Sequence, residues 1–185
     1  MSFIKLPNSN EFLKIRNVLV LFSFLLIVLF VKYLYKSSRE VMYDEIVANS
    51  FEGNVDFKIY VEKFYRDCEF YGLFPRRPDT IIIRFSKLDQ LVNTTHIHGL
   101  SLGYNEDTKI EIYINPSSWN RFSKSSKYFL MYHELAHDVL NLEDLDNVPI
   151  NEGKLMYPEL SSFNNKNMDD FIECYHKLFD EISKK

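Results

Sequence analysis

Hydrophobic residues follow two different patterns along this chain. Residues 18–31 form an apolar run without a charged side chain, and the residues after Lys32 extend it to Tyr35. Beyond about residue 41, apolar and polar residues alternate or recur at helical spacing, which is typical of elements that bury one face. These patterns divide the chain into an N-terminal tail (1–17), an apolar segment (18–35) and a domain (41–185).

The apolar segment predicts a single transmembrane helix. A spanning helix needs about 20 apolar residues, and Lys or Tyr at the ends of a shorter run can reach the interface. A cleaved signal peptide is an alternative, but the following Lys-Tyr-Leu-Tyr-Lys offers no small-residue cleavage site. A core helix that is apolar on all sides would be hard to cover in so small a protein. Basic residues flank both ends almost equally, so the orientation stays open.

The domain pattern predicts a mixture of helices and a small sheet. The expected elements, in chain order, are a helix over 55–71, a strand over 79–86, a strand within 94–104, a strand over 109–115, a long helix from Ser123 or Ser126 to Leu140, and a last helix over 167–182. The order helix, strands, helix, irregular loop, helix indicates an α+β domain.

Charge and cysteine content exclude two classes of protein. The 22 basic and 26 acidic residues give a net charge of −4, so no positive excess is available for a nucleic-acid backbone. The 2 cysteines, Cys68 and Cys174, are too few for a disulfide scaffold. We interpret both as core residues, and whether they pair stays open.

The motif with the clearest chemistry is His-Glu-Leu-Ala-His at 133–137, within the expected long helix. Residues four apart on a helix lie on the same face, so His133 and His137 can bind one Zn²⁺ ion. Glu134 can then take a proton from a zinc-activated water and pass it to a leaving amine. With 5 His in 185 residues, the pattern arises by chance only about 0.01 times per chain. The sequence therefore predicts a zinc-dependent metallopeptidase.

Downstream, Gly-Lys-Leu-Met-Tyr-Pro at 153–158 resembles the Met-turn of the metzincin peptidases, and Leu-Met-Tyr-Pro is particularly similar to the matrixin version. The resemblance covers about residues 110–160 and extends to small metallopeptidase-like proteins encoded by bacteriophages. It implies a minimal zincin domain with a small sheet, an active-site helix, a Met-turn and a C-terminal helix. It also implies zinc endopeptidase activity on a peptide or protein substrate, with Met156 in an apolar floor beneath the zinc histidines.

Two carboxylates compete for the position of third zinc ligand. The extended metzincin motif would have Gly at 140 and a ligand at 143, where this chain has Leu140 and Glu143. Asn141 tolerates the left-handed conformation that ends a helix, and a turn there makes Asp144 the residue three positions beyond. Zinc accepts a carboxylate in place of imidazole. We favour Asp144, with Glu143 as the alternative, and an acidic surface loop remains the other interpretation of both.

Three further hypotheses stay open at the level of sequence. In a gluzincin arrangement the third ligand would be a Glu on a later helix, with Glu173 preferred over Glu159 and Glu152. The missing third histidine also fits a catalytically weak or inactive zinc-binding protein that acts through contacts at a membrane. Finally, His96 and His98 share one strand face and could serve a second metal or a substrate edge.

Overall fold

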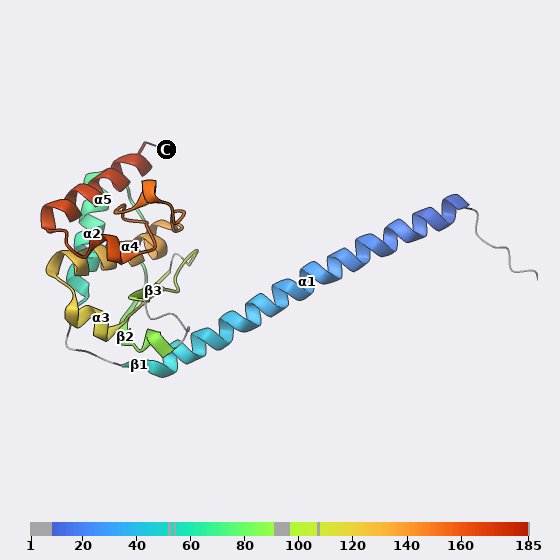
Figure 1. Ribbon diagram of the computed structural model, residues 1–185, viewed down its shortest axis with the longest axis horizontal. Coiled ribbons are helices and arrows are strands. Elements are labelled where there is room, and N and C mark those ends of the chain that lie inside the picture. Colours follow the sequence, from blue (N-terminus) through green and yellow to red (C-terminus); the bar gives the residue numbers. More distant parts are fainter. Residues whose placement is uncertain (1–8, 52, 54, 91–96, 107, 185) are drawn as a thin grey trace, which may run out of the picture. The chain divides into compact units, whose positions relative to one another are not determined.

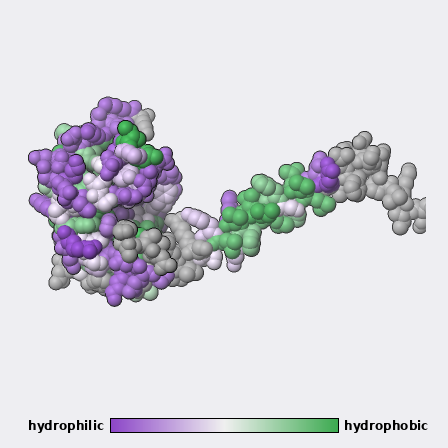
Figure 2. Space-filling view, in the orientation of Figure 1, coloured by the Kyte–Doolittle hydropathy of each residue, from purple (hydrophilic) through white to green (hydrophobic). Residues whose placement is uncertain are grey.

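The computed structural model describes residues 9–51, 53, 55–90, 97–106 and 108–184, and the chain forms two units that divide after Glu45. Helix α1 (Ser9–Asn49) makes up most of the first unit (Figure 1). Its segment Arg16–Ser37 is long and apolar enough to cross a membrane, and none of it is buried. Figure 2 shows the corresponding hydrophobic surface along this helix. The predicted apolar helix is confirmed, although a signal sequence near an N-terminus would have the same length and composition.

A small sheet organises the second unit, which runs from Ile46 to the C-terminus. Its strand order is β1-β2-β4-β3, with β2 and β4 parallel and the other two pairs antiparallel. The strands are β1 (Ser50–Phe51), β2 (Thr80–Ser86), β3 (Gly99–Ser101) and β4 (Lys109–Ile114). Because β3 stands at the end of this order, it is an edge strand with one neighbour in the sheet.

The helices that begin in the described part of the second unit are α2 (Lys58–Phe70), α3 (Pro116–Arg121), α4 (Lys124–Leu140) and α5 (Met168–Ile182). Short 3-10 turns lie at Leu88–Gln90, Pro149–Asn151 and Leu160–Phe163. Helix α4 packs against β3, β4, α2 and α5, so it is the central element of the domain. The Ser123 side chain caps its first turn by accepting a hydrogen bond from Ser126 N–H.

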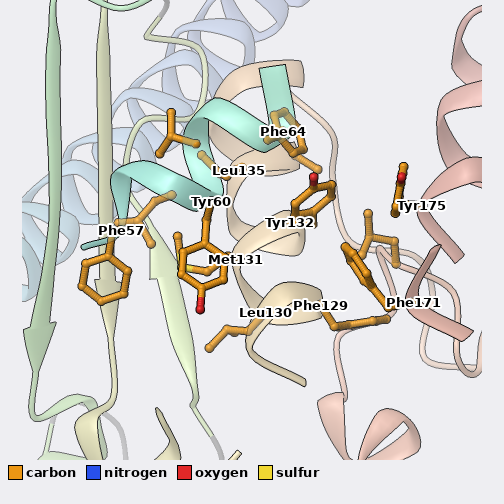
Figure 3. Packing of buried hydrophobic residues seen from close by; sticks show 14 of the residues in the cluster. Phe57, Tyr60, Phe64, Phe129, Leu130, Met131, Tyr132, Leu135, Phe171 and Tyr175 are labelled. Carbon is orange, nitrogen blue, oxygen red and sulfur yellow. The ribbon is translucent and has the colours of Figure 1, made fainter. Parts of the chain in front are cut away.

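Aromatic side chains fill the interfaces between the helices. Figure 3 shows Tyr60 and Phe64 of α2 on one side of α4, and Phe171 and Tyr175 of α5 on the other. Tyr132, which is fully buried, contacts rings from both neighbouring helices. Its hydroxyl donates a 2.5 Å hydrogen bond to Asp67. This packing fixes α4 on two sides, and the residue after Tyr132 begins the His-Glu-Leu-Ala-His motif.

The α+β class and every strand and helix expected within the domain are confirmed, within a few residues at the ends. Helix α1 is longer than the expected span 18–35 at both ends, because it runs from Ser9 to Asn49. Helix α3 was not expected; the Asn115 side chain caps it and Pro116 occupies its first turn. Strand β4 is buried on both faces, since Tyr113, which alternates with its isoleucines, is 2% exposed. Glu111, on the same face as Tyr113, is 3% exposed. Its carboxylate accepts hydrogen bonds from Tyr113 (2.9 Å) and Lys109, which offset the cost of burial.

Candidate metal centre

The two motif histidines meet at one point on the surface of α4. His133 Nε2 and His137 Nε2 lie 3.2 Å apart, and the two rings are perpendicular with centroids 4.7 Å apart. Both side chains are largely buried, with 13% and 17% of their surface exposed. The helical spacing therefore does what the sequence predicted: it directs both imidazoles to one place.

Backbone carbonyls determine which ring nitrogen is free on each histidine. His133 Nδ1 lies 2.7 Å from the Leu155 carbonyl oxygen, and His137 Nδ1 lies 2.6 Å from that of Leu142. A carbonyl only accepts hydrogen bonds, so each Nδ1 carries the proton and each neutral ring presents an Nε2 lone pair. Metal-binding histidines are oriented by this kind of hydrogen bond.

Asp144 supplies a third donor atom at the same point. Its Oδ1 lies 3.4 Å from His133 Nε2 and 3.3 Å from His137 Nε2. The chain reaches it because α4 ends at Asn141, whose φ of 51° and ψ of 40° are left-handed. The expected helix end at Asn141 is thus confirmed, and the residue three positions beyond faces the histidines.

The three side chains shift one another's pKa values. Burial and the neighbouring His137 lower the pKa of His133. Burial also opposes the charged form of His137, but the Asp144 hydrogen bond and the nearby Glu134 outweigh it and raise the pKa. For Asp144, the hydrogen bond and the charges of both histidines outweigh burial and lower the pKa. The two histidines thus favour the ionised carboxylate form of Asp144.

The donor set fits a divalent metal ion such as Zn²⁺. With metal–ligand bonds of about 2.0–2.1 Å, tetrahedral coordination places ligand atoms about 3.3 Å apart. The three observed separations are 3.2, 3.3 and 3.4 Å. Two lone pairs that face each other at 3.2 Å repel unless a positive charge lies between them. His133, His137 and Asp144 could therefore bind a metal ion.

Glu134 lies in the same cleft and is 5% exposed. Burial raises the pKa of its carboxyl to about 8, while the nearby His137 and the Ser101 backbone act in the opposite direction. The carboxyl thus belongs to the site but is not one of the three converging donors. This is the arrangement expected of a proton-transfer group beside a metal centre.

The cleft has a volume of about 430 Å³ and combines this polar floor with apolar walls. Its apolar lining comes from strand β3, helix α4 and the segment after the Met-containing turn: Ile97, Leu100, Phe129, Leu130, Pro158 and Leu160. Glu143 also lines the cleft, and its Oε1 accepts a 3.3 Å hydrogen bond from the Tyr104 hydroxyl. Glu143, the alternative ligand, therefore faces Tyr104, and the structure does not group it with the two histidines.

Met156 lies in a segment whose backbone contacts both His133 and the loop that follows α4. The residue is 2% exposed, and the preceding carbonyl of Leu155 is the acceptor for His133. The carbonyl of Met156 itself accepts a 2.8 Å hydrogen bond from Leu145 N–H, directly after Asp144. The turn therefore contacts the chain on both sides of the donor set.

The other candidate residues lie elsewhere. Glu173 forms a 2.6 Å ion pair with Lys177 on the exposed side of α5, and Glu159 accepts a hydrogen bond from Asn147. Glu152 and Glu173 line a second cavity that does not contain the histidines. His98 Nδ1 lies 2.8 Å from Ser118 Oγ, and His96 lies outside the described residues. Cys68 and Cys174 are buried free thiols.

Sequence reasoning missed Gly-Leu-Ser-Leu-Gly at 99–103, which has the Gly-x-Ser-x-Gly pattern of serine-hydrolase nucleophile elbows. An elbow requires a sharp turn from strand to helix. Here Gly99–Ser101 forms the antiparallel edge strand β3, and Ser101 Oγ donates to Asp138 at 3.0 Å. The pattern is visible in the sequence, but in the structure Ser101 binds Asp138 of α4 and does not stand on a nucleophile elbow.

No protein-family model, curated protein or solved structure matches this chain.

Proposed function

We propose that this protein is a membrane-anchored, zinc-dependent peptidase that hydrolyses peptide bonds in the cleft beside α4. The observation that carries the proposal is the convergence of His133 Nε2, His137 Nε2 and Asp144 Oδ1 at separations suited to tetrahedral coordination. Three protein ligands and one open position are characteristic of catalytic rather than structural zinc sites.

In the proposed site, His133, His137 and Asp144 hold the metal ion. A bound zinc ion supplies Lewis-acid chemistry, because it polarises a carbonyl group and makes water a stronger acid. Leu155 and Leu142 hold the two rings through their Nδ1–H groups. The turn around Met156 contacts His133 and the loop that carries Asp144, which is the position that the metzincin resemblance implies for it.

Glu134 is the proposed general base and then the general acid. Its carboxylate takes a proton from the attacking water as the new C–O bond forms at the scissile carbonyl. It then passes the proton to the amide nitrogen as the C–N bond breaks, so that an acid and an amine leave. The apolar walls of the cleft would exclude bulk water from this exchange and accommodate substrate side chains.

Helix α1 supports the membrane part of the proposal. No residue of its span Arg16–Ser37 is buried. A helix that exposes large apolar side chains on all sides is unfavourable in water and suited to the hydrocarbon core of a membrane. We propose that this span anchors the peptidase as a single-pass protein. Partition of the full chain into the membrane fraction, resistant to extraction by alkaline carbonate, would support the anchor; a shortened mature chain lacking this span would indicate a signal sequence.

The decisive test compares metal content and hydrolysis in the detergent-solubilised full chain. We expect about one zinc per wild-type chain and hydrolysis of a mixed peptide library. Glu134→Gln should keep the zinc and lose hydrolysis by about 10²–10⁴-fold, because only the proton-transfer group is changed. Asp144→Ala should lose zinc, whereas Glu143→Ala, which changes a neighbouring carboxylate in the same cleft, should retain it.

Two results would contradict the proposal in different ways. A wild-type chain without bound zinc after refolding with the metal would eliminate the metal centre. Bound zinc without hydrolysis of any peptide would favour the alternative of a metal-binding interaction protein. Unchanged hydrolysis in Glu134→Gln would exclude that residue as the base.

A further inference from the structure

The face of α4 toward the sheet bears a second carboxylate that the proposed reaction does not use. Asp138 lies one turn beyond Glu134 and is 3% exposed. A buried carboxylate is costly unless hydrogen bonds compensate for the lost water. The hydrogen-bond partners of Asp138 therefore indicate its structural role.

Those partners belong to both strands of the β3–β4 hairpin. Asp138 Oδ2 accepts hydrogen bonds of 3.0 Å from the Ser101 hydroxyl and of 3.0 Å from the Glu111 backbone N–H. Among the described residues, the other oxygen, Oδ1, is buried without a hydrogen-bond partner. One side chain of α4 thus holds the edge strand β3 and its neighbour β4 together.

Strand β3 contacts both carboxylates of α4. The Ser101 hydroxyl binds Asp138, and the backbone at Gly99 lies directly against the Glu134 carboxylate. Pairing with β4 holds β3 within the sheet, and the contact between Ser101 and Asp138 holds it against α4. The position of Gly99 beside Glu134 therefore depends on Asp138.

Two glycines show how closely the strand approaches these carboxylates. A Cβ atom at Gly99 would lie 2.4 Å from Glu134 Oε1, and one at Gly103 would lie 2.1 Å from Asp138 Oδ2. Neither glycine has a left-handed φ, so the requirement for glycine here is space.

We propose that Asp138 is a positioning residue that holds Ser101 and the β3–β4 hairpin on α4, so that Gly99 of β3 confines the Glu134 carboxylate in the cleft. The expected effect on catalysis rests on the proposed peptidase function, whereas the contact between Asp138 and the β3–β4 hairpin does not. The test therefore needs one readout of the hairpin and one of hydrolysis.

Amide hydrogen exchange and steady-state kinetics of the zinc-loaded full chain provide these readouts. In Asp138→Ala, we expect exchange of the Ser101 and Glu111 amides to accelerate by at least about tenfold. We expect kcat to fall by about 10–100-fold with KM and zinc content little changed, as for other residues that orient reacting groups. Asp138→Asn should largely restore both, because the amide oxygen can accept the same two hydrogen bonds.

Two further variants separate positioning from stability. Ser101→Ala removes only the hydroxyl and should give the same changes in weaker form, which keeps the test decisive if Asp138→Ala does not fold. Ser125→Ala is the control: Ser125 is also buried on α4 and donates to the Lys166 carbonyl at 2.6 Å. It should lower stability without changing kcat or exchange in residues 99–103.

The outcomes distinguish this inference from the proposed function. Wild-type exchange at Ser101 in both Asp138→Ala and Ser101→Ala would overturn the positioning role. So would an Asp138→Asn variant as impaired as Asp138→Ala, since charge rather than hydrogen bonding would then matter. If the wild type hydrolyses no peptide but the exchange pattern is as expected, the peptidase proposal fails and the structural role of Asp138 stands.

Discussion

Replacing Gly99 with alanine perturbs the proposed base without touching the metal ligands. The new Cβ would lie 2.4 Å from Glu134 Oε1, 2.9 Å from its Cδ and 3.0 Å from its Cγ. Ordinary contacts begin at about 3.4 Å, so the carboxylate must move by roughly 1 Å. A displacement of this size costs on the order of 10²-fold in rate, or about 2.7 kcal/mol of transition-state stabilisation. Overpacking should also cost about 1–3 kcal/mol of folding free energy.

The assay measures kcat, zinc content and Tm of the purified full chain. We expect kcat of Gly99→Ala to be about 100-fold lower than wild type, with zinc still bound because neither imidazole is displaced. Gly72→Ala is a matched control. Gly72 has a φ of 74°, so alanine there costs about 1–2 kcal/mol in backbone strain, but its Cβ meets nothing within 4 Å. Hydrolysis per folded molecule should be unchanged in this control.

Two results would refute this reasoning. Gly99→Ala with wild-type kcat and bound zinc would show that the observed position of the Glu134 carboxylate is irrelevant to hydrolysis. Loss of zinc from Gly99→Ala, but not from Gly72→Ala, would show that β3 supports the metal ligands rather than the base.

Three other predictions follow from separate parts of the domain. Burial raises the pKa of the Cys68 and Cys174 thiols to about 12, so a thiol reagent at pH 8 should react slowly with the native chain and titrate two thiols after unfolding; a disulfide would leave none. Removal of zinc by a chelator should lower Tm by roughly 10–15 °C if the ion is present at about 1,000 times its Kd, and calorimetry would reveal an unchanged Tm if no ion binds. Asn141→Ala should be less stable than Asn141→Gly by about 1 kcal/mol, because alanine tolerates the left-handed conformation poorly; equal unfolding free energies would contradict this.

Local signals made the central helix and its motif predictable. Ser123 caps α4, the apolar positions have helical spacing, and Asn141 ends the helix in the conformation that its side chain tolerates. The placement of His133 and His137 on one face follows from their spacing on a helix. The burial of free Cys68 and Cys174 likewise agrees with their interpretation as core residues.

Contacts between distant segments were not predictable in the same way. Ser101 and Asp138 are 37 positions apart, and nothing in either sequence neighbourhood specifies the partner. The burial of Glu111 also depends on distant segments, because β4 lies between β2 and β3, although its hydrogen-bond partners Lys109 and Tyr113 are only two positions away. Side chains that serve tertiary contacts carry no periodic signal, so the sequence indicated the donor set but not the hydrogen bonds that orient it.

The difference between Asp144 and Glu143 shows how backbone anchoring selects the donor. Leu142 is fixed through both of its backbone groups, since its N–H donates to the Ala136 carbonyl at 3.1 Å and its own carbonyl accepts from His137. Leu145 N–H is held by Met156. Asp144 lies between these two anchored residues with a short side chain that reaches the histidines. A helix that ended one residue earlier would shift this loop by one position, and Glu143 would then occupy the place that Asp144 has here. The carboxylate at this position is therefore selected by where α4 ends, and Asn141 determines that end.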